Sequence, residues 1–332
     1  MSEQDYYQLT PDTVLDAIES LGIQLDGSML TLNSYENRVY RVRDLDGVKL
    51  VAKFYRPGRW SEQQIFEEHE FSQQLMDAEI PVVGPLQLDG GKTLHHWQSY
   101  RFSLFPCHGG RAPELDDEKH LLWLGRYMAR IHNVGGIKLF NQRPAINCQN
   151  FGYDSLEFLR NGPHIPPSLL IAYETIASQV LAASQAIFEE RKSSQIIRLH
   201  CDCHPGNILW TDDGPHIVDL DDCRNGPAIQ DLWMLLGGGE ETMNERLEIM
   251  LEGYQEFRDF DGQELSLIEP LRSLRMIHYS AWLSRRWSDP SFQHNFPWFA
   301  ETKYWEQQIL DLKEQLAVIS DPPIKNLVSG NC

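Results

Sequence analysis

The chain contains 332 residues, of which 42% are hydrophobic and 11% aromatic, so it can bury a core in two modest domains or in one bilobal unit. Its 48 acidic and 29 basic residues give a formal net charge of -19 at pH 7. This charge argues against nucleic acid or an anionic membrane surface as a general partner, although it leaves a small local basic site open.

The N-terminal segment lacks the basic region of a secretory signal, since the first positively charged side chain is Arg38. No apolar run approaches the ~20 residues that a membrane helix needs. The six cysteines are scattered through a chain too large to need disulfides, which is typical of a reducing compartment. We therefore expect a cytoplasmic protein with no membrane partner and no nucleic acid partner.

The first hundred residues predict a helix followed by strands. Residues 11–22 have helical periodicity, and Asp46-Gly47, a favoured hairpin dipeptide, separates two β-rich runs. We expect residues 38–43 and 49–55 to pair antiparallel. A helix is expected over 61–76, with Ser61 as its N-cap, and further strands are expected around 82–88 and 100–105.

Helical patterns dominate after residue 105. They recur over 121–132, 170–190, 228–236, 243–257 and 267–287, and one hairpin around Asp213-Gly214 interrupts them. Residues 322–332 predict a frayed tail. The sequence therefore predicts an α+β, bilobal fold. Residues 1–105 form an N-terminal lobe with an antiparallel sheet and one main helix, and residues 106–332 form a larger, mostly helical C-terminal lobe.

The segment "HCDCHPGN", residues 200–207, concentrates side chains that can bind a metal or act on a substrate. A structural zinc site takes cysteines at C-x(2–4)-C with a second pair elsewhere. Cys201 and Cys203 are closer than that, and no second pair lies at ligand spacing. Phosphoryl transfer from ATP fits the segment better, because Asp202 is then a candidate to orient the attacking hydroxyl and accept its proton.

The predicted hairpin begins at Asn207, and its second strand ends at Asp219, so the two side chains are expected side by side. Carboxamide and carboxylate oxygens suit Mg²⁺. We expect His200 to anchor the loop through hydrogen bonds. Because Cys201 and Cys203 flank Asp202, oxidation of these thiols is a further hypothesis for inhibition under stress.

These motifs resemble those of the protein-kinase-like superfamily. "HCDCHPGN" resembles the H-x-D-x-x-x-x-N catalytic loop, and "IVDLDD" resembles the D-F-G element. The form H-x-D-x-H-x-x-N with D-L-D-D is closest to the aminoglycoside phosphotransferase and choline kinase branch, which usually has glycine where Cys201 stands. The resemblance implies ATP and Mg²⁺ as cofactors. It implies Asp202 as catalytic base, Asn207 and Asp219 as metal ligands, and Asp221 as a weaker candidate for a second metal contact.

The N-terminal lobe offers the partners that such kinases need. They place a lysine on the third strand to neutralise the nucleotide phosphates and a helix glutamate to hold that lysine. Lys53 in "LVAKFY" matches the lysine. Of Glu67, Glu68 and Glu70, Glu68 best matches the family spacing, and the other two are expected on a solvated face.

The remaining candidates contact the nucleotide or support the loop. "NSYENRVY" lacks the glycines of the protein kinase phosphate loop, so Ser34 and Asn37 are candidates to donate hydrogen bonds instead, while a plain turn at Asn33-Ser34 fits the segment equally well. Backbone groups from Phe105 to Cys107 resemble the hinge that binds adenine. Asp231 is read either as an N-cap or as the residue that ties its helix to the catalytic loop in the superfamily.

The resemblance extends along nearly the whole chain. "LNSYENRVY", "KFYRP.RW", "NGPA.QDLWMLL" and "AWLSRRWSDPSFQHNFPW" resemble the bacterial stress response kinase A family. This resemblance implies a cytoplasmic, monomeric Ser/Thr protein kinase linked to stress, with protein substrates that include itself.

Two other functions remain open from the residues alone. A small-molecule kinase would enclose an amino alcohol, a sugar or an aminoglycoside-like acceptor with its C-terminal helices. The aromatic residues Tyr279, Trp282, Trp287, Phe296 and Trp298 can line such a pocket, or they can belong to the core. A non-catalytic nucleotide-binding module fits less well, since such a module has no need of a proton acceptor.

Overall fold

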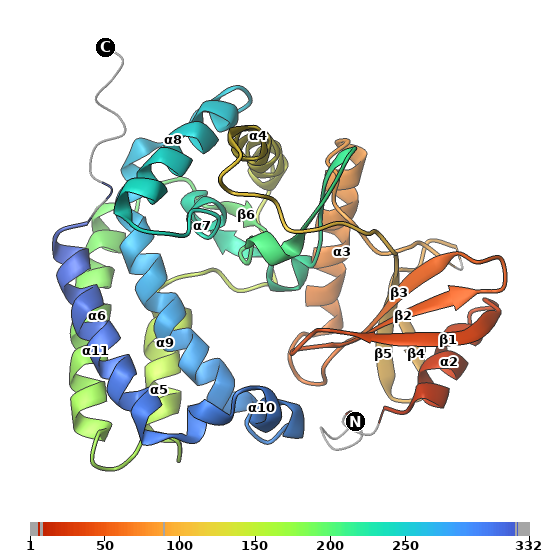
Figure 1. Cartoon of the computed structure of the whole chain (residues 1–332), viewed down its shortest axis with the longest axis horizontal. Coiled ribbons are helices and arrows are strands. Elements are labelled where there is room, and N and C mark those ends of the chain that lie inside the picture. Colours follow the sequence, from red (N-terminus) through yellow and green to blue (C-terminus); the bar gives the residue numbers. More distant parts are fainter. Residues whose placement is uncertain (1–5, 7–8, 89, 323, 325–332) are drawn as a thin grey trace. The chain divides into compact units, whose positions relative to one another are not determined.

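The structure is a computed structural model that describes residue 6 and residues 9–88, 90–322 and 324 (Figure 1). Most of the predicted tail, residues 322–332, lies outside this range. The chain divides into two compact units, residues 1–113 with 204–222 and residues 114–203 with 223–332. The lobe boundary expected after residue 105 stays a prediction.

A five-stranded antiparallel sheet forms the centre of the first unit. Its strand order is β1-β2-β3-β5-β4. The predicted hairpin is confirmed, since Arg38 lies opposite Phe54 and Arg43 lies opposite Lys49. Buried side chains of β2, β3 and β5 pack with the helix α2 into one core. The strands span β1 Leu25–Leu32, β2 Arg38–Asp44, β3 Lys49–Phe54, β4 His95–Trp97 and β5 Tyr100–Pro106.

The strands of the sheet differ from the prediction at three places, one of which is the short strand β4, which was not predicted. The strand β1 was not predicted, because Asp26-Gly27-Ser28 resembles a turn and the pairing shifts register between Leu25 and Met29. The strand predicted at 82–88 is wrong. Only isolated bridges occur there, at Val82 and Leu88, because Pro85 has no N–H to donate and interrupts the ladder. The additional strand makes β3, which carries Lys53, the third strand of the sheet.

Two helices and a hairpin complete the first unit. The predicted helices are confirmed as α2, Pro11–Glu19, and α3, Glu62–Asp77. Ser61 caps α3, since its hydroxyl accepts the Gln64 N–H while the Gln64 side chain accepts the Ser61 N–H. The hairpin β7–β8, Ile208–Thr211 with Gly214–Ile217, also forms as predicted.

The second unit is mostly helical. All five predicted helices are present, but α5, α10, α11 and the short β6–β9 pair were missed. α11 has a clear signal, because its buried residues Trp305, Ile309 and Leu312 follow helical spacing. The elements span α4 Glu118–Gly135, α5 Asp154–Arg160, α6 Leu170–Glu190, β6 Ile197–Leu199, β9 Arg224–Gly226, α7 Ile229–Trp233, α8 Glu240–Gln255, α9 Ile268–Arg286, α10 Pro290–Asn295 and α11 Thr302–Ser320.

Two glycines allow α4 and α8 to pack closely. A Cβ atom at Gly125 would clash with the Met250 carbonyl, and one at Gly253 would clash with the Leu122 carbonyl. The contact of the two backbones therefore requires glycine at both positions.

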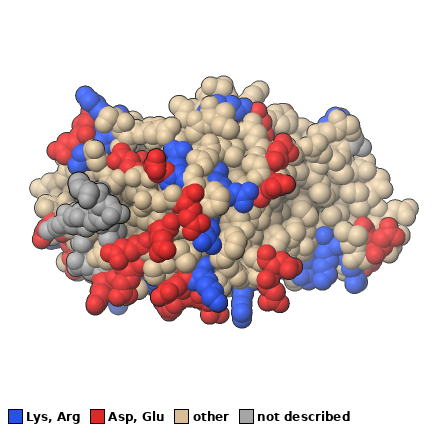
Figure 2. All heavy atoms as spheres, turned by 90° about the horizontal axis from the view of Figure 1, so that it is seen from above, with Lys and Arg blue, Asp and Glu red and all other residues tan. Residues whose placement is uncertain are grey.

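Within the part of the chain that the structure describes, no helix combines the length and the hydrophobicity needed to cross a membrane. Figure 2 shows one face of the molecule, on which acidic side chains form several groups with basic side chains interspersed. The strongly negative charge is thus accompanied by local positive charge.

Candidate active site

Lys53 lies within a cluster of carboxylates in the first unit. It is on the middle strand β3 and only 6% exposed. Its Nζ lies 3.1 Å from Asp221 Oδ1, 3.2 Å from Asp219 Oδ1 and 3.5 Å from Glu68 Oε1. Burial by itself lowers the pKa of Lys53, but these three carboxylates together raise it well above its usual value. Lys53 is therefore held as a cation.

The structure brings Lys53 together with the glutamate that the spacing favoured. Glu68 is buried on α3, at 2% exposure. Glu67 is half-buried and Glu70 is exposed, where it accepts a hydrogen bond from the Gln74 side chain. Glu68 therefore forms a buried ion pair with Lys53.

Asn207 and Asp219 lie at the open end of the β7–β8 hairpin. Ile208 pairs with Ile217, and the Val218 N–H donates to the Asn207 carbonyl over 3.0 Å. Asp219 follows directly, with a half-exposed side chain and a left-handed backbone, φ 61°. Such a conformation is costly for a residue with a side chain and is frequent at functional sites. The hairpin thus presents both predicted metal ligands from one end, and their role stays a prediction.

Asp221 pairs with cations on both carboxylate oxygens. Oδ1 faces Lys53, and Oδ2 lies 2.6 Å from Arg59 Nη1. Arg59 also reaches Asp222 Oδ2 at 2.8 Å and Glu36 Oε2 at 3.3 Å. These ion pairs make Asp221 a poorer metal ligand than Asp219, and they make Arg59 a central residue of the cluster that the sequence did not reveal.

The loop before β2 is held by arginine rather than by glycine flexibility. Arg56 is buried and donates to the carbonyls of Glu36 and Tyr35. Asn37 is also buried, and its side-chain oxygen accepts the Arg56 N–H over 3.2 Å. Ser34 is half-buried. The Asn37 oxygen thus has a structural contact, and nucleotide contacts of Ser34 and Asn37 stay predictions.

The predicted hinge lies at the end of β5. Phe105 pairs with Val51 of β3, and its ring lies 5.9 Å from Lys53 Nζ. Phe105 and Cys107 are both half-buried. The hinge candidates thus belong to the same sheet as Lys53, and binding of adenine there stays a prediction.

Asp231 organises the candidate catalytic loop in the second unit. It is fully buried, and its carboxylate accepts the backbone N–H groups of His200, over 2.9 Å, and Cys201, over 2.6 Å. Its Oδ2 also lies 3.2 Å from His132 Nε2. The N-cap interpretation of Asp231 is wrong, because α7 begins after Ala228. Asp231 instead ties α7 to the loop.

Asp202 lies in this loop beside an arginine. Its N–H donates to His200 Nδ1 over 3.4 Å, in line with an anchoring His200. Its Oδ1 lies 2.9 Å from Arg275 Nη1 on α9. The exposed fractions are 26% for the Asp202 side chain and 43% for that of Arg275, so solvent reaches both. The candidate base is thus accessible and paired with a cation.

The hypothesis of thiol oxidation finds no support in the structure. Cys201 is 4% exposed and Cys203 is fully buried. Burial raises the pKa of the Cys203 thiol well above its usual value, and the Asp231 and Asp202 carboxylates raise it further. Because the thiolate is the form that reacts with oxidants, neither position favours oxidation.

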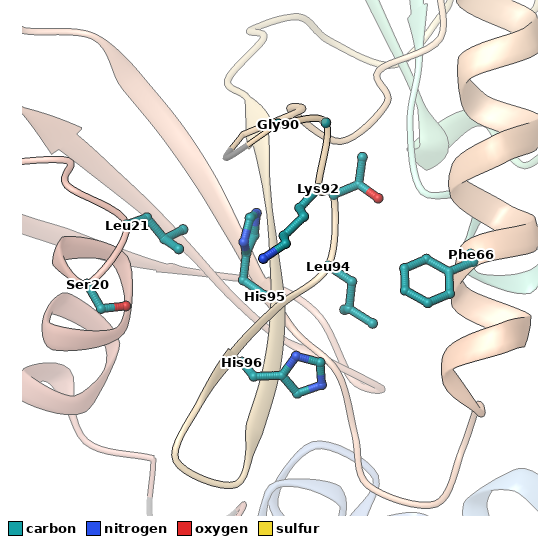
Figure 3. A pocket seen from close by; sticks show the side chains of 10 residues that line it. Ser20, Leu21, Phe66, Gly90, Lys92, Leu94, His95 and His96 are labelled. Carbon is teal, nitrogen blue, oxygen red and sulfur yellow. The ribbon is translucent and has the colours of Figure 1, made fainter.

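A surface pocket of about 720 Å³ in the first unit contains none of the predicted site residues. Figure 3 shows it between the end of α2, the Phe66 ring on α3, and Leu94 with the following strand residues His95 and His96. His96 Nε2 lies 2.8 Å from Glu62 Oε1. This pocket is therefore separate from the residues predicted to carry out catalysis.

The fold and these residues define a class of protein. The model of the phosphotransferase enzyme family matches residues 30–268, and the chain belongs to that family. It has the protein-kinase-like fold. The amicoumacin kinase hAmiN in complex with AMP-PNP, Ca²⁺ and Ami has a TM-score of 0.74 at 18% identity, over 95% of this chain and 96% of that one. A microcompartment-associated aminopropanol kinase has a TM-score of 0.69 at 17% identity, over 93% and 97%.

Relatives with similar sequences indicate a narrower family. The stress response kinase A of Escherichia coli O157:H7 is 44% identical over 320 residues, 96% of each chain. A serine/threonine protein kinase of Salmonella typhimurium is 43% identical over the same shares. The chain is a kinase of the stress response kinase A family.

Proposed function

We propose that this kinase transfers the γ-phosphoryl group of ATP, with Mg²⁺, to serine and threonine hydroxyls of proteins, including its own, and that it works as a cytoplasmic monomer in a bacterial stress response. The observation that carries the ATP chemistry is the buried Lys53 cation beside Glu68 and Asp219. The protein acceptor is supported by the Salmonella relative, which is named a serine/threonine protein kinase.

The donor set fits Mg²⁺. Mg²⁺ usually binds through one or two carboxylates together with substrate phosphates and water, not in a cage built of protein alone. Among the described residues no three His, Cys, Asp or Glu side chains form such a cage. Asp219 and Asn207 supply the hard oxygen ligands from one hairpin end, and Mg²⁺ bound there would neutralise phosphate charge.

The residues of the chain then act by orientation and charge. Lys53, held by Glu68, neutralises phosphate oxygens of ATP. Asp202 orients the acceptor hydroxyl and takes its proton as the oxygen bonds to phosphorus and ADP departs. Asp231 holds the backbone on the N-terminal side of Asp202, so the position of the base is set before the substrate arrives.

A small cationic alcohol is the alternative acceptor. The residues Tyr279 and Trp298 are each 37% exposed, and their rings can stack on a cation. Against this acceptor stands Arg275, which places a positive charge beside the candidate base. The protein acceptor is therefore preferred.

The test compares the wild type with Asp202→Asn. Purified protein is incubated with γ-labelled ATP and Mg²⁺, and label is measured on the kinase and on a general protein substrate. We expect Asp202→Asn to lower turnover by roughly 10² to 10⁴, because the proton acceptor is lost, while AMP-PNP binding stays nearly unchanged, because Asp202 is not proposed to contact the nucleotide.

Retained activity in Asp202→Asn would contradict the role of the base. An absence of label on any protein in the wild type, with normal AMP-PNP binding, would favour the small-molecule acceptor. A parallel reaction with amino alcohols would then identify it.

A further inference from the structure

The ion pair of Asp202 and Arg275 restricts which acceptor molecules can reach the candidate base. Asp202 comes from the candidate catalytic loop and Arg275 from α9, both within the second unit. Their atoms lie 2.9 Å apart, and both side chains are partly exposed. An acceptor that brings its hydroxyl to Asp202 must therefore also meet the Arg275 guanidinium.

This guanidinium selects among acceptors by charge. An ammonium group beside the hydroxyl would be repelled by Arg275, whereas a carboxylate would be attracted to it. A guanidinium also binds a carboxylate through two parallel hydrogen bonds, so the preference has a geometric component.

The next turns of α9 and the segment that follows α10 carry a series of aromatic rings. Tyr279 stacks on Trp282 with ring centroids 5.5 Å apart, Trp282 contacts Phe296, and Phe296 contacts Trp298. Tyr279 lies one helical turn after Arg275. Tyr279 and Trp298, at the two ends of this series, are each 37% exposed, whereas Trp282 and Phe296 are half-buried. Aromatic rings that stay partly exposed are typical of surfaces that bind other molecules. We call these four residues the α9 aromatic strip.

We infer that Arg275 makes this enzyme selective for serine or threonine segments with an acidic residue beside the acceptor, and that the α9 aromatic strip binds an apolar residue farther along the same segment. The inference rests on the proposed protein kinase function and specifies its substrate class. The occupant is an extended peptide, because Arg275 and Trp282 are about 10 Å apart along α9, which is more than one small amino alcohol can span.

Binding and activation of the base are coupled in this arrangement. When the acidic residue of the acceptor pairs with Arg275, Asp202 Oδ1 is released to accept a hydrogen bond from the acceptor hydroxyl. The O–H bond then breaks with its proton passing to Asp202, the oxygen forms a bond to the γ-phosphorus, and the bond from phosphorus to the ADP oxygen breaks. An acceptor without the acidic residue leaves Arg275 on Asp202.

The test uses three serine peptides that differ only beside the acceptor, where they carry aspartate, glutamine or lysine. Initial rates with γ-labelled ATP and Mg²⁺ give kcat/KM for the wild type, Arg275→Gln and Arg275→Glu. Peptide affinity is measured separately with AMP-PNP, in the absence of turnover. Arg160→Gln is the matched control, because Arg160 forms another exposed ion pair of the second unit, 3.3 Å from Glu174.

We expect the wild type and Arg160→Gln to prefer the aspartate peptide over the lysine peptide by roughly tenfold or more in kcat/KM. Arg275→Gln should remove this preference, and Arg275→Glu should reverse it. All three peptides carry the same phenylalanine farther along the segment. Replacing this phenylalanine of the aspartate peptide with alanine should weaken binding to the wild type, and Trp298→Ala should weaken binding of the original peptide equally.

Three results would overturn the inference. Equal rates with all three peptides in the wild type would remove the selectivity while leaving the protein kinase function intact. A uniform loss of kcat in Arg275→Gln with the preference retained would assign Arg275 to the transferred phosphoryl group instead. Phosphorylation of amino alcohols but of no peptide or protein would overturn the proposed function itself.

Discussion

The backbone conformation of Cys201 is fixed by hydrogen bonds in the candidate catalytic loop. Its backbone is left-handed, φ 70°, which favours glycine. Its N–H donates to Asp231, and its carbonyl accepts from the Gln230 side chain over 3.0 Å, so both backbone groups fix this conformation. Glycine, the residue usual in the related branch, fits the same backbone without a side chain.

Replacing Cys201 tests this constraint. We expect Cys201→Val to lower the free energy of unfolding by about 1–3 kcal/mol, because a β-branched side chain opposes a positive φ. Cys201→Gly should stay within about 1 kcal/mol of the wild type, since the relief of the backbone offsets the greater entropy of the unfolded chain. Urea denaturation measures both, and equal losses in the two variants would show that the buried thiol matters more than the backbone.

At the scale of elements, α7 is the support of the candidate catalytic loop. α7 is short, and two buried carboxylates connect it to its surroundings through hydrogen bonds. Asp231 binds the loop backbone, and Glu264 accepts the Ile229 N–H at the start of the helix over 2.9 Å. Burial raises the pKa of Glu264 to about 7, opposed by the hydrogen bond from Ile229.

Glu264 therefore makes stability depend on pH. The pKa of Glu264 in the folded state lies above its usual value, so the folded state binds the proton more tightly than the unfolded state does. This tighter binding adds to the free energy of unfolding at low pH, and the added stability is lost as the pH rises from 4.5 to about 7. We expect Glu264→Gln to gain up to about 3 kcal/mol relative to the wild type across this window, because glutamine keeps the acceptor without the charge.

Denaturation of both proteins at several pH values checks this expectation. The exposed Glu174→Gln variant serves as a control, since its side chain is 41% exposed. A constant difference between Glu264→Gln and the wild type at all pH values would contradict the raised pKa.

The elements that the sequence predicted best are those with local signals. The β2–β3 hairpin follows from Asp46-Gly47, and α3 follows from its capping box. The strand β1 was missed because its own residues resemble a turn, and only its pairing with β2 makes it a strand. A strand that depends on its neighbour in this way carries little local signal.

At the scale of the whole molecule, nucleotide binding should stabilise the folded chain. AMP-PNP with Mg²⁺ at 100 times its Kd adds about 2.7 kcal/mol, which corresponds to an increase in Tm of roughly 4 °C for a chain of this size. EDTA should reduce the shift, because Asp219 and Asn207 then contribute no metal contact. Lys53→Met should abolish it, since the phosphates lose their buried cation.

A thermal shift assay measures these changes against each protein without nucleotide, so that any lower Tm of Lys53→Met itself is taken into account. Arg43→Gln, which removes an exposed ion pair with Asp26 from the same sheet, is the matched control and should keep the full shift. An equal shift in Lys53→Met would contradict the role of the buried lysine.

The sequence by itself determined the class of fold and the hairpin with Asn207 and Asp219 at its end, because both rest on short spacing or on local periodicity. The choice of Lys53 and Glu68 came from the resemblance of the motifs to those of the protein-kinase-like superfamily. Only the tertiary structure decided that Arg59 pairs with Asp222, 163 positions away, and that Arg275 lies beside Asp202. Partners so distant in sequence share no local pattern. Their contact is set by how helices and strands pack. This packing places the positive charge of Arg275 beside the candidate base Asp202.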